Sequence, residues 1–170
     1  MIEGVISHDL IRQNDLRGSF TKILTNFDVY EGLNLNFVEC FVSKNFTGSV
    51  RGMHLQIGLS KNYRLIYVTQ GEIQDALVDL RSTSSTFGQV ESRLLTFERP
   101  QTILIPPGVA HGFQSLSEST MIYLTTSTYN PGLDVGVNPL SIGLKWLLPI
   151  THLSSRDKLL PDLSDWDIVV

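Results

Sequence analysis

Short runs of apolar and β-branched residues recur along the chain, separated by clusters of Gly, Pro, Asn and Ser. The runs with this strand pattern are 35–42, 63–69, 73–80, 91–95, 102–105 and 121–125. The segments between them are rich in turn residues, as at 70–72, 82–85 and 106–108. Only 19–30 and 154–160 have the pattern of short helices. Many short strands at this spacing predict a mainly β sandwich or jelly roll rather than alternating βαβ units.

The composition is that of a globular domain. The 170 residues are 42% hydrophobic and 18% charged, with a formal net charge of -4. This balance excludes a disordered chain, and no apolar run is long enough to span a bilayer. The mild acidity, without a basic stripe, argues against nucleic acid as a partner. We expect one domain over 1–170, with a short C-terminal segment from about 151.

The cysteine content and the first residues of the chain bear on the compartment in which the protein works. Cys40 is the single cysteine, so an internal disulfide framework is excluded. The first residues lack the basic start and the apolar block of a secretory signal. These observations predict a cytoplasmic protein.

Four histidines are the first candidates for chemistry. His8 and His152 have polar, unpatterned neighbours, which predicts surface positions. His54 follows Arg51 and a glycine that allows close backbone approach, and His111 follows a rigid Pro-Pro-Gly turn. From the pattern alone, each of these two is either a structural histidine with one hydrogen bond or a general base, since imidazole titrates near pH ~6.5.

The spacing of Pro106, Gly108 and His111 resembles the second motif of cupins, which are small jelly-roll proteins that often bind a metal. The first cupin motif supplies two histidines and a glutamate, whereas this chain has His54 and Gln56 there. A divalent metal needs three or four ligands. We therefore expect no metal.

Several further stretches follow one another in the order seen in the dTDP-4-dehydrorhamnose 3,5-epimerases, and together they make the whole chain resemble that family. These stretches are 15–20, 51–54, 71–73, 78–81, 84–88, 105–113 and 153–157. The resemblance implies a cupin-type jelly roll that forms a homodimer. It also implies an enzyme that acts without a cofactor on a nucleotide-diphosphate-linked 4-keto-6-deoxyhexose.

The resemblance also implies roles for single residues. A proton beside a ketone can be removed when a base takes it and the enolate oxygen is stabilised, and inversion then needs an acid on the opposite face. His54 matches the family's base, Asp157 its partner, and Tyr123 the general acid. Arg64 stands where the family usually has an active-site lysine, so the charge is kept in a bulkier, planar group.

Matching residues for the rest of the substrate show further differences from the family. Arg17 and Arg51 match the pyrophosphate-binding arginines, whose forked donors suit a diphosphate. The other matches are Phe20 and Tyr129 for packing on the base and sugar, Ser43 for a polar contact, and His111 near the reacting oxygen, with Asp75 as its candidate partner. Glu39 and Phe41 stand where relatives commonly have glutamine and asparagine.

Lys22 stands where relatives present a glutamate to the pyrimidine. Thymine has a donor at N3, which a carboxylate accepts, whereas cytosine has an acceptor there, which an ammonium satisfies. One hypothesis is therefore a CDP-linked rather than a dTDP-linked sugar. The alternative is that Lys22 is simply solvent-exposed and that another group contacts the base.

Three functions remain open at this point. The leading one is an epimerase that inverts C3, or C3 and C5, in deoxysugar synthesis for a polysaccharide or a glycosylated product. A ketoisomerase on the same substrate class would use the same base but return the proton elsewhere. A non-catalytic nucleotide-sugar-binding cupin is the third, because Arg64, Glu39 and Phe41 differ from the family pattern.

Overall fold

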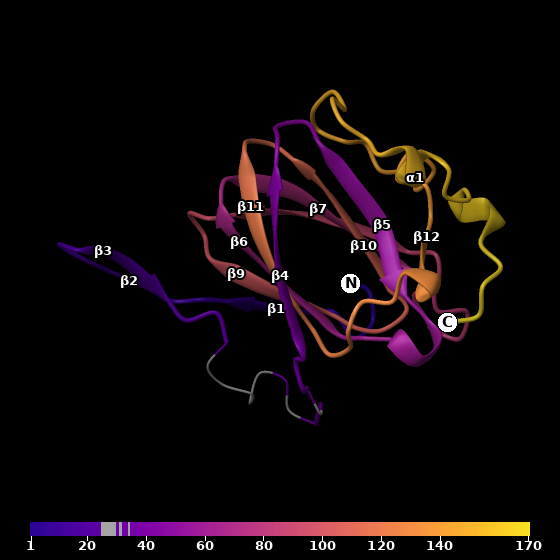
Figure 1. Ribbon diagram of the computed structural model, residues 1–170, viewed down its shortest axis with the longest axis horizontal. Helices are drawn as coiled ribbons and strands as arrows, with labels where there is room; N and C mark the ends of the chain where they lie inside the picture. The colour runs from indigo at the N-terminus through magenta and orange to yellow at the C-terminus, as the bar shows by residue number, and fades with distance from the viewer. Residues whose placement is uncertain (25–29, 31, 34) are drawn as a thin grey trace.

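Two five-stranded antiparallel sheets face each other in the computed structural model, which describes residues 1–24, 30, 32–33 and 35–170 (Figure 1). The first sheet consists of β1 (Ile6–Asp9), β9 (Gln101–Ile105), β6 (Arg64–Gln70), β11 (Ser119–Thr125) and β4 (Glu39–Asn45). The second consists of β12 (Asp134–Gly136), β5 (Val50–Gln56), β10 (Val109–Ser115), β7 (Glu72–Asp79) and β8 (Val90–Thr96). The predicted mainly β sandwich is confirmed.

The core lies between the two sheets because alternate side chains of each strand point inward. In β11, Met121 and Tyr123 are buried while Ile122 and Leu124 are half-buried on the other face. Phe113 from β10 lies in the same cluster, which the sheets enclose from both sides. The inward face of β11 therefore presents Tyr123 to the space between the sheets.

The chain after β12 covers the outer face of the second sheet with loops and short helices (Figure 1). Trp146 and Trp166 pack there against Met53 and Val78. The helical segments are η2 (Gly58–Ser60), η3 (Pro131–Leu133), α1 (Ser155–Lys158) and η4 (Leu163–Asp165). The helix predicted at 154–160 is thus confirmed as a single turn, with Ser154 as its N-cap.

The helix predicted at 19–30 is wrong over its described start. β2 (Arg12–Asp15) and β3 (Gly18–Thr21) form a hairpin that projects from the sandwich (Figure 1). Its turn is closed by the Asp15 carboxylate, which accepts a hydrogen bond from the Arg17 backbone N–H at 2.8 Å. Gly18 then takes a φ of 130°, which favours glycine. Residues 25–29 of the predicted helix lie outside the described residues.

The predicted strands at 63–69, 73–80, 91–95, 102–105 and 121–125 match β6, β7, β8, β9 and β11 within two residues. The strand predicted at 35–42 instead begins at Glu39. Glu39 lies opposite Thr125, where β11 ends, so no partner strand continues beside the residues before it. The extent of the pairing with β11, rather than the apolar run in the sequence, therefore sets where β4 begins.

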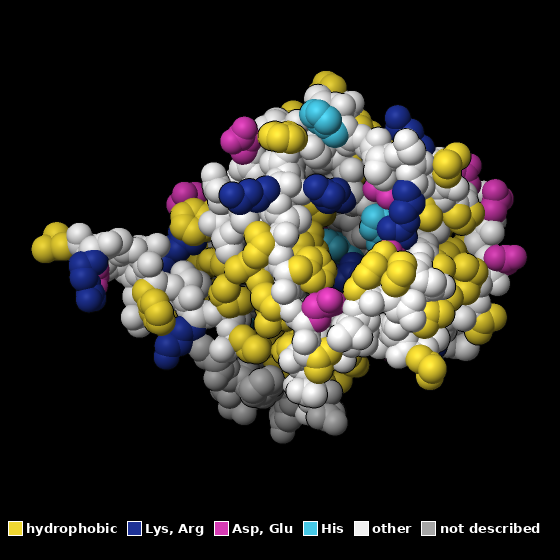
Figure 2. Space-filling model, in the orientation of Figure 1, with side chains coloured by type: hydrophobic (Ala, Val, Ile, Leu, Met, Phe, Trp, Pro, Cys, Tyr) yellow, Lys and Arg dark blue, Asp and Glu magenta, His cyan; other side chains and the backbone are white. Residues whose placement is uncertain are grey.

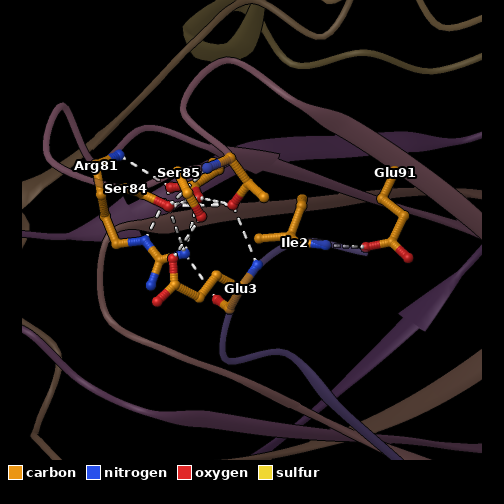
Figure 3. A network of polar contacts seen from close by, with 8 residues as sticks. Ile2, Glu3, Arg81, Ser84, Ser85 and Glu91 are labelled. Atoms are coloured by element: carbon orange, nitrogen blue, oxygen red, sulfur yellow. Dashed lines mark hydrogen bonds and ion pairs between the residues drawn. The ribbon is translucent and has the colours of Figure 1, made fainter.

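A polar network ties the N-terminus to the loop between β7 and β8 (Figure 3). The Asp79 carboxylate accepts hydrogen bonds from Arg81, Ser84 and Thr86, at 2.6 to 2.8 Å. Arg81 and Thr86 also hold the backbone of Glu3. Burial opposes ionisation of Asp79, but these donors outweigh it and lower its pKa to about 2. The stretches 78–81 and 84–88, which resemble the epimerase family in sequence, therefore have a structural role.

Candidate active site

A cavity of about 1050 Å³ opens between the sheets and is closed on one side by the C-terminal segment. Figure 2 shows it as a hollow with histidine side chains inside and lysine and arginine side chains around it. Most of the predicted site residues line it: Glu39, Ser43, Arg51, His54, Arg64, His111, Tyr123, Tyr129 and Asp157. Arg17 and Phe20 on the hairpin, and Lys22 beside it, do not.

His54 and Asp157 form a pair on the β5 wall of the cavity. Nε2 of His54 lies 2.7 Å from Oδ1 of Asp157, which is the buried residue of α1. The Gly52 backbone N–H donates to Oδ2 of Asp157 at 3.4 Å, and Ser154 caps the helix by accepting from the Asp157 N–H at 3.0 Å. The carboxylate is thus held against one ring nitrogen of the imidazole, which remains partly open to the cavity.

The charge of Asp157 is maintained despite its burial. Burial disfavours the carboxylate, but the hydrogen bond and charge of His54 outweigh this effect and keep the pKa of Asp157 below its ordinary value. An ionised carboxylate beside the ring orients it and stabilises its protonated form. The arrangement is therefore suited to a general base.

Glycines allow β5 and β10 to approach closely beside this pair. Gly52 has a φ of 118°, and a Cβ there would lie 2.7 Å from the carbonyl oxygen of His111 and would collide with Gly112. His54 and His111 are directly opposite in the register of these strands. The glycine of the Arg51–His54 stretch thus serves close contact between strands, which places two histidines on one wall.

His111 is buried and bonded to Asp75, as the sequence had suggested for that pair. Its Nε2 lies 2.7 Å from Oδ1 of Asp75 on β7. Burial lowers the pKa of His111 below its ordinary value, although the Asp75 charge opposes this. Because its Nε2 is bonded to Asp75, the His111 ring is held in place on the wall beside His54.

Tyr123 and Arg64 come from the opposite sheet, on β11 and β6. Burial raises the pKa of Tyr123 to about 12, so the phenol keeps its proton at neutral pH. Burial also lowers the pKa of Arg64, whose Nε has no hydrogen-bond partner among the described residues. A buried guanidinium with a free donor at the cavity is suited to stabilise an anion there.

The remaining predicted cavity residues lie around its mouth. Arg51 is exposed and its Nε donates to Oδ1 of Asn45 at 2.7 Å. Asn45 in turn donates to the Ser43 hydroxyl at 3.2 Å. Glu39 accepts from the backbone N–H of Tyr129 at 3.1 Å, which ties β4 to the loop that carries this aromatic ring.

The three predicted nucleotide-binding residues Arg17, Phe20 and Lys22 are exposed on or beside the hairpin. Arg17 is paired with Asp15 at 2.6 Å, within the hairpin itself. No described residue of the hairpin lines the cavity of its own chain. The structure therefore separates the predicted site into a cavity group and a hairpin group.

The sequence reasoning missed other residues at the cavity. Asn45 orients Arg51, and Arg156 pairs with Asp134 at 2.7 Å beside the pair of His54 and Asp157. His152, predicted as a surface residue, is exposed at the cavity rim with its ring centroid 5.8 Å from that of Phe46. Only Arg156, which adjoins Asp157, carried a signal that could have found it.

Neither a cluster of metal ligands nor a membrane-spanning helix is present in the part of the chain that the structure describes. No group of three or more His, Cys, Asp or Glu side chains is arranged to hold a metal ion. No helix among the described residues is long and apolar enough to cross a membrane. The expectations of a metal-free and cofactor-free enzyme stay predictions.

Comparison with known proteins now bears on the identity of the chain. The family model described as dTDP-4-dehydrorhamnose 3,5-epimerase matches residues 1–165. The chain belongs to this family. The predicted class of enzyme, a carbohydrate epimerase, is therefore confirmed, as is its assignment to deoxysugar biosynthesis.

Individual relatives of this epimerase agree in sequence and in fold. The dTDP-4-dehydrorhamnose 3,5-epimerase of Salmonella typhimurium is 33% identical over 153 residues, 86% of this chain and 84% of the relative. A Legionella pneumophila 3,5-epimerase solved with dTDP-4-keto-L-rhamnose is 29% identical, with a TM-score of 0.91 over 98% of this chain and 92% of that one. A 3'-monoepimerase from Streptomyces bikiniensis, solved with dTDP-quinovose, is 27% identical, with a TM-score of 0.88 over 96% and 85%.

Proposed function

We propose that the protein inverts C3, or both C3 and C5, of a nucleotide-diphosphate-linked 4-keto-6-deoxyhexose. The observation that carries this proposal is the placement of a general base, with its carboxylate partner, and a general acid on opposite walls of the cavity. His54 with Asp157 lies on the β5 wall, and Tyr123 lies on β11 of the other sheet. A sugar ring between the walls would expose one face to the imidazole and the other to the phenol.

The reaction follows from these positions. His54 takes the proton from the carbon next to the ketone, and the C–H electron pair moves into the enolate, leaving negative charge on the former ketone oxygen. Arg64 stabilises that oxygen, and Asp157 stabilises the imidazolium. Tyr123 then donates its proton to the opposite face of the carbon, and the phenolate and imidazolium re-equilibrate with solvent. The carbonyl stays at its original carbon, as epimerisation requires.

The diphosphate would be held at the mouth, where Arg51 is exposed and oriented by Asn45. A second arginine, Arg17, lies on the hairpin outside this cavity. We therefore propose a homodimer in which the hairpin of one copy reaches the cavity of the other and adds Arg17 and Phe20 to it. Exposed Leu16 and Phe20 on the hairpin, and exposed Val42 on the edge strand β4, support burial against a second copy.

A finer part of the proposal is which nucleobase, thymine or cytosine, the substrate carries. Two solved relatives hold dTDP-linked ligands, which favours a dTDP-sugar for this protein as well. If the Lys22 ammonium contacts the base, it favours cytosine. If it stays in solvent, it favours neither thymine nor cytosine. Calorimetric titration with dTDP and CDP separates these cases, because clearly tighter dTDP binding contradicts the cytosine hypothesis. The cytoplasmic location stays a prediction.

Incubation with dTDP- and CDP-4-keto-6-deoxyglucose in deuterated water, followed by NMR, tests the proposed reaction. Deuterium at C3 alone indicates a 3-epimerase, and deuterium at C3 and C5 indicates a 3,5-epimerase. A displaced carbonyl would identify a ketoisomerase. Tight binding without deuterium at either carbon would contradict the proposal and leave a nucleotide-sugar-binding protein.

A further inference from the structure

Phe41 lies face to face with Tyr123 on the cavity wall. The two residues are directly opposite in the register of β4 and β11. Their ring centroids are 4.7 Å apart and their planes differ by 9°, which is an offset stack. Phe41 is 41% exposed and lines the cavity, whereas Tyr123 beneath it is 6% exposed.

The phenol of Tyr123 has both polar and aromatic neighbours. Its hydroxyl donates to Sδ of Met121 at 3.4 Å, and a thioether is a weak acceptor. The Ser43 hydroxyl accepts a hydrogen bond from Asn45, and burial raises the pKa of Tyr123 against the smaller, opposing effect of this hydroxyl's interaction with the phenol. On another side, the His111 ring meets Tyr123 edge-on, with centroids 6.1 Å apart. The rings that pack on Tyr123 therefore restrict the phenol together with these polar contacts.

We propose that Phe41 is a positioning residue for the inversion step, and that its ring holds the Tyr123 hydroxyl toward the substrate. This inference rests on the proposed epimerase function. The stack is formed by two residues that face each other across paired strands of this cavity wall. The ring supplies no proton and takes none. It acts by restricting the tilt of the Tyr123 side chain, against which it stacks.

Proton removal and proton delivery use different residues, and this separates the two steps experimentally. When His54 removes the proton and Tyr123 is well placed, the intermediate is protonated on the opposite face and inverts. When Tyr123 is displaced, the intermediate more often regains a proton or deuteron from His54 on its original face. The ratio of deuterium exchange to inversion therefore reports the position of Tyr123, and general loss of stability does not change it.

The test compares this ratio for the wild type, Phe41→Leu and Phe41→Trp, measured by NMR with dTDP-4-keto-6-deoxyglucose in deuterated water. Loss of the stack should raise the ratio in Phe41→Leu by about two- to tenfold, the fold-change that corresponds to a typical aromatic pair. Phe41→Trp keeps a stacking ring and should remain near the wild-type ratio. Phe87→Leu, the same substitution on an exposed turn remote from the cavity, should not change the ratio.

Melting temperature and dTDP affinity, measured for each variant, show that the protein compared is folded and binds ligand. An unchanged ratio in Phe41→Leu, or a Phe41→Trp ratio equal to that of Phe41→Leu, would overturn the role of Phe41 while leaving the epimerase function intact. A wild type that exchanges no deuterium at all would overturn both.

Discussion

At the residue scale, Asp157 has one proposed task. It orients the His54 imidazole and stabilises the protonated form of that ring. Its lowered pKa keeps it ionised at neutral pH, 2.7 Å from His54. Asp157→Asn preserves the shape but removes the charge and changes the hydrogen bond. We expect kcat to fall by about a hundredfold to ten-thousandfold, with little change in dTDP affinity.

Steady-state kinetics and calorimetry on the same preparation measure these two quantities. Glu118→Gln, a neutralised carboxylate on an exposed turn, is the matched control. A near-normal kcat for Asp157→Asn would remove Asp157 from the catalytic pair.

Sequence reasoning at the residue scale succeeds where a residue sits in a recognisable stretch. His54, His111 and Asp157 are each flanked by motif residues, and the structure brings them to one cavity. Asn45 and Asp134 are not marked in this way, because they reach the cavity only through the pairing of β4 with β11 and of β12 with β5. Contacts made by tertiary pairing leave no local pattern in one sequence.

Helix α1 is too short to hold Asp157 in place by itself, since four residues make one turn. Arg156 links this helix to β12, with its Nη2 2.7 Å from the Asp134 carboxylate and 3.2 Å from the Asp134 carbonyl. The same carboxylate accepts from the Tyr129 hydroxyl at 3.3 Å. These contacts join α1 to the loop of a predicted nucleotide-binding residue.

Arg156→Ala should therefore lower kcat by about tenfold through a misplaced Asp157, because small displacements in an active site are costly. Arg156→Lys keeps the charge without the fork and should fall between wild type and Arg156→Ala. Initial-rate kinetics measure the effect. If kcat of Arg156→Ala equals that of the wild type, α1 is held by other contacts.

The Asp79 network belongs to the element scale because it fastens the N-terminus to the turn after β7. Its folded-state pKa of about 2 lies below the ordinary value of 3.8. The stabilisation from its charge is therefore fully present above about pH 4 and is lost as pH falls toward 2. Its size is about 2 kcal/mol.

Urea unfolding at pH 7, 4 and 2.5 checks this expectation against Asp79→Asn. The variant should be less stable at pH 7 and should lose less stability on acidification than the wild type. Glu118→Gln should follow the wild type. An equally steep acid dependence in Asp79→Asn would show that its charge does not stabilise the fold.

Strands were predictable where a segment rich in apolar residues is paired with a neighbouring strand on each side, as in β6 and β7. β5 was missed because Gly52, His54 and Gln56 interrupt its apolar pattern. Those residues are there for close packing on β10 and for the cavity. The hairpin of β2 and β3 was missed because it is polar and exposed, so no burial pattern marks it.

At the scale of the whole molecule, the predicted site residues form two groups, one in the cavity and one on the projecting hairpin. A dimer in which each hairpin serves the other copy's cavity would bring the two groups together. Arg17→Ala and His54→Ala would each impair activity when assayed alone. If the hairpin serves the other copy's cavity, a mixed dimer has one site with both His54 and Arg17 intact.

Equal amounts of the two variants, refolded together, should therefore recover activity to about a quarter of the wild-type level, since half of the dimers are mixed and each has one intact site. The separately refolded variants, combined only in the assay, are the control. Activity no higher than the control mean would contradict a shared site.

The central claim is that His54 removes a proton beside the ketone. The most direct measurement is the rate of deuterium incorporation at C3 of the 4-keto-6-deoxyhexose, followed by NMR for wild type and His54→Ala at equal dTDP saturation. The account predicts steady incorporation by the wild type and a loss of at least about a hundredfold in His54→Ala. Incorporation by His54→Ala at a rate near that of the wild type would contradict it.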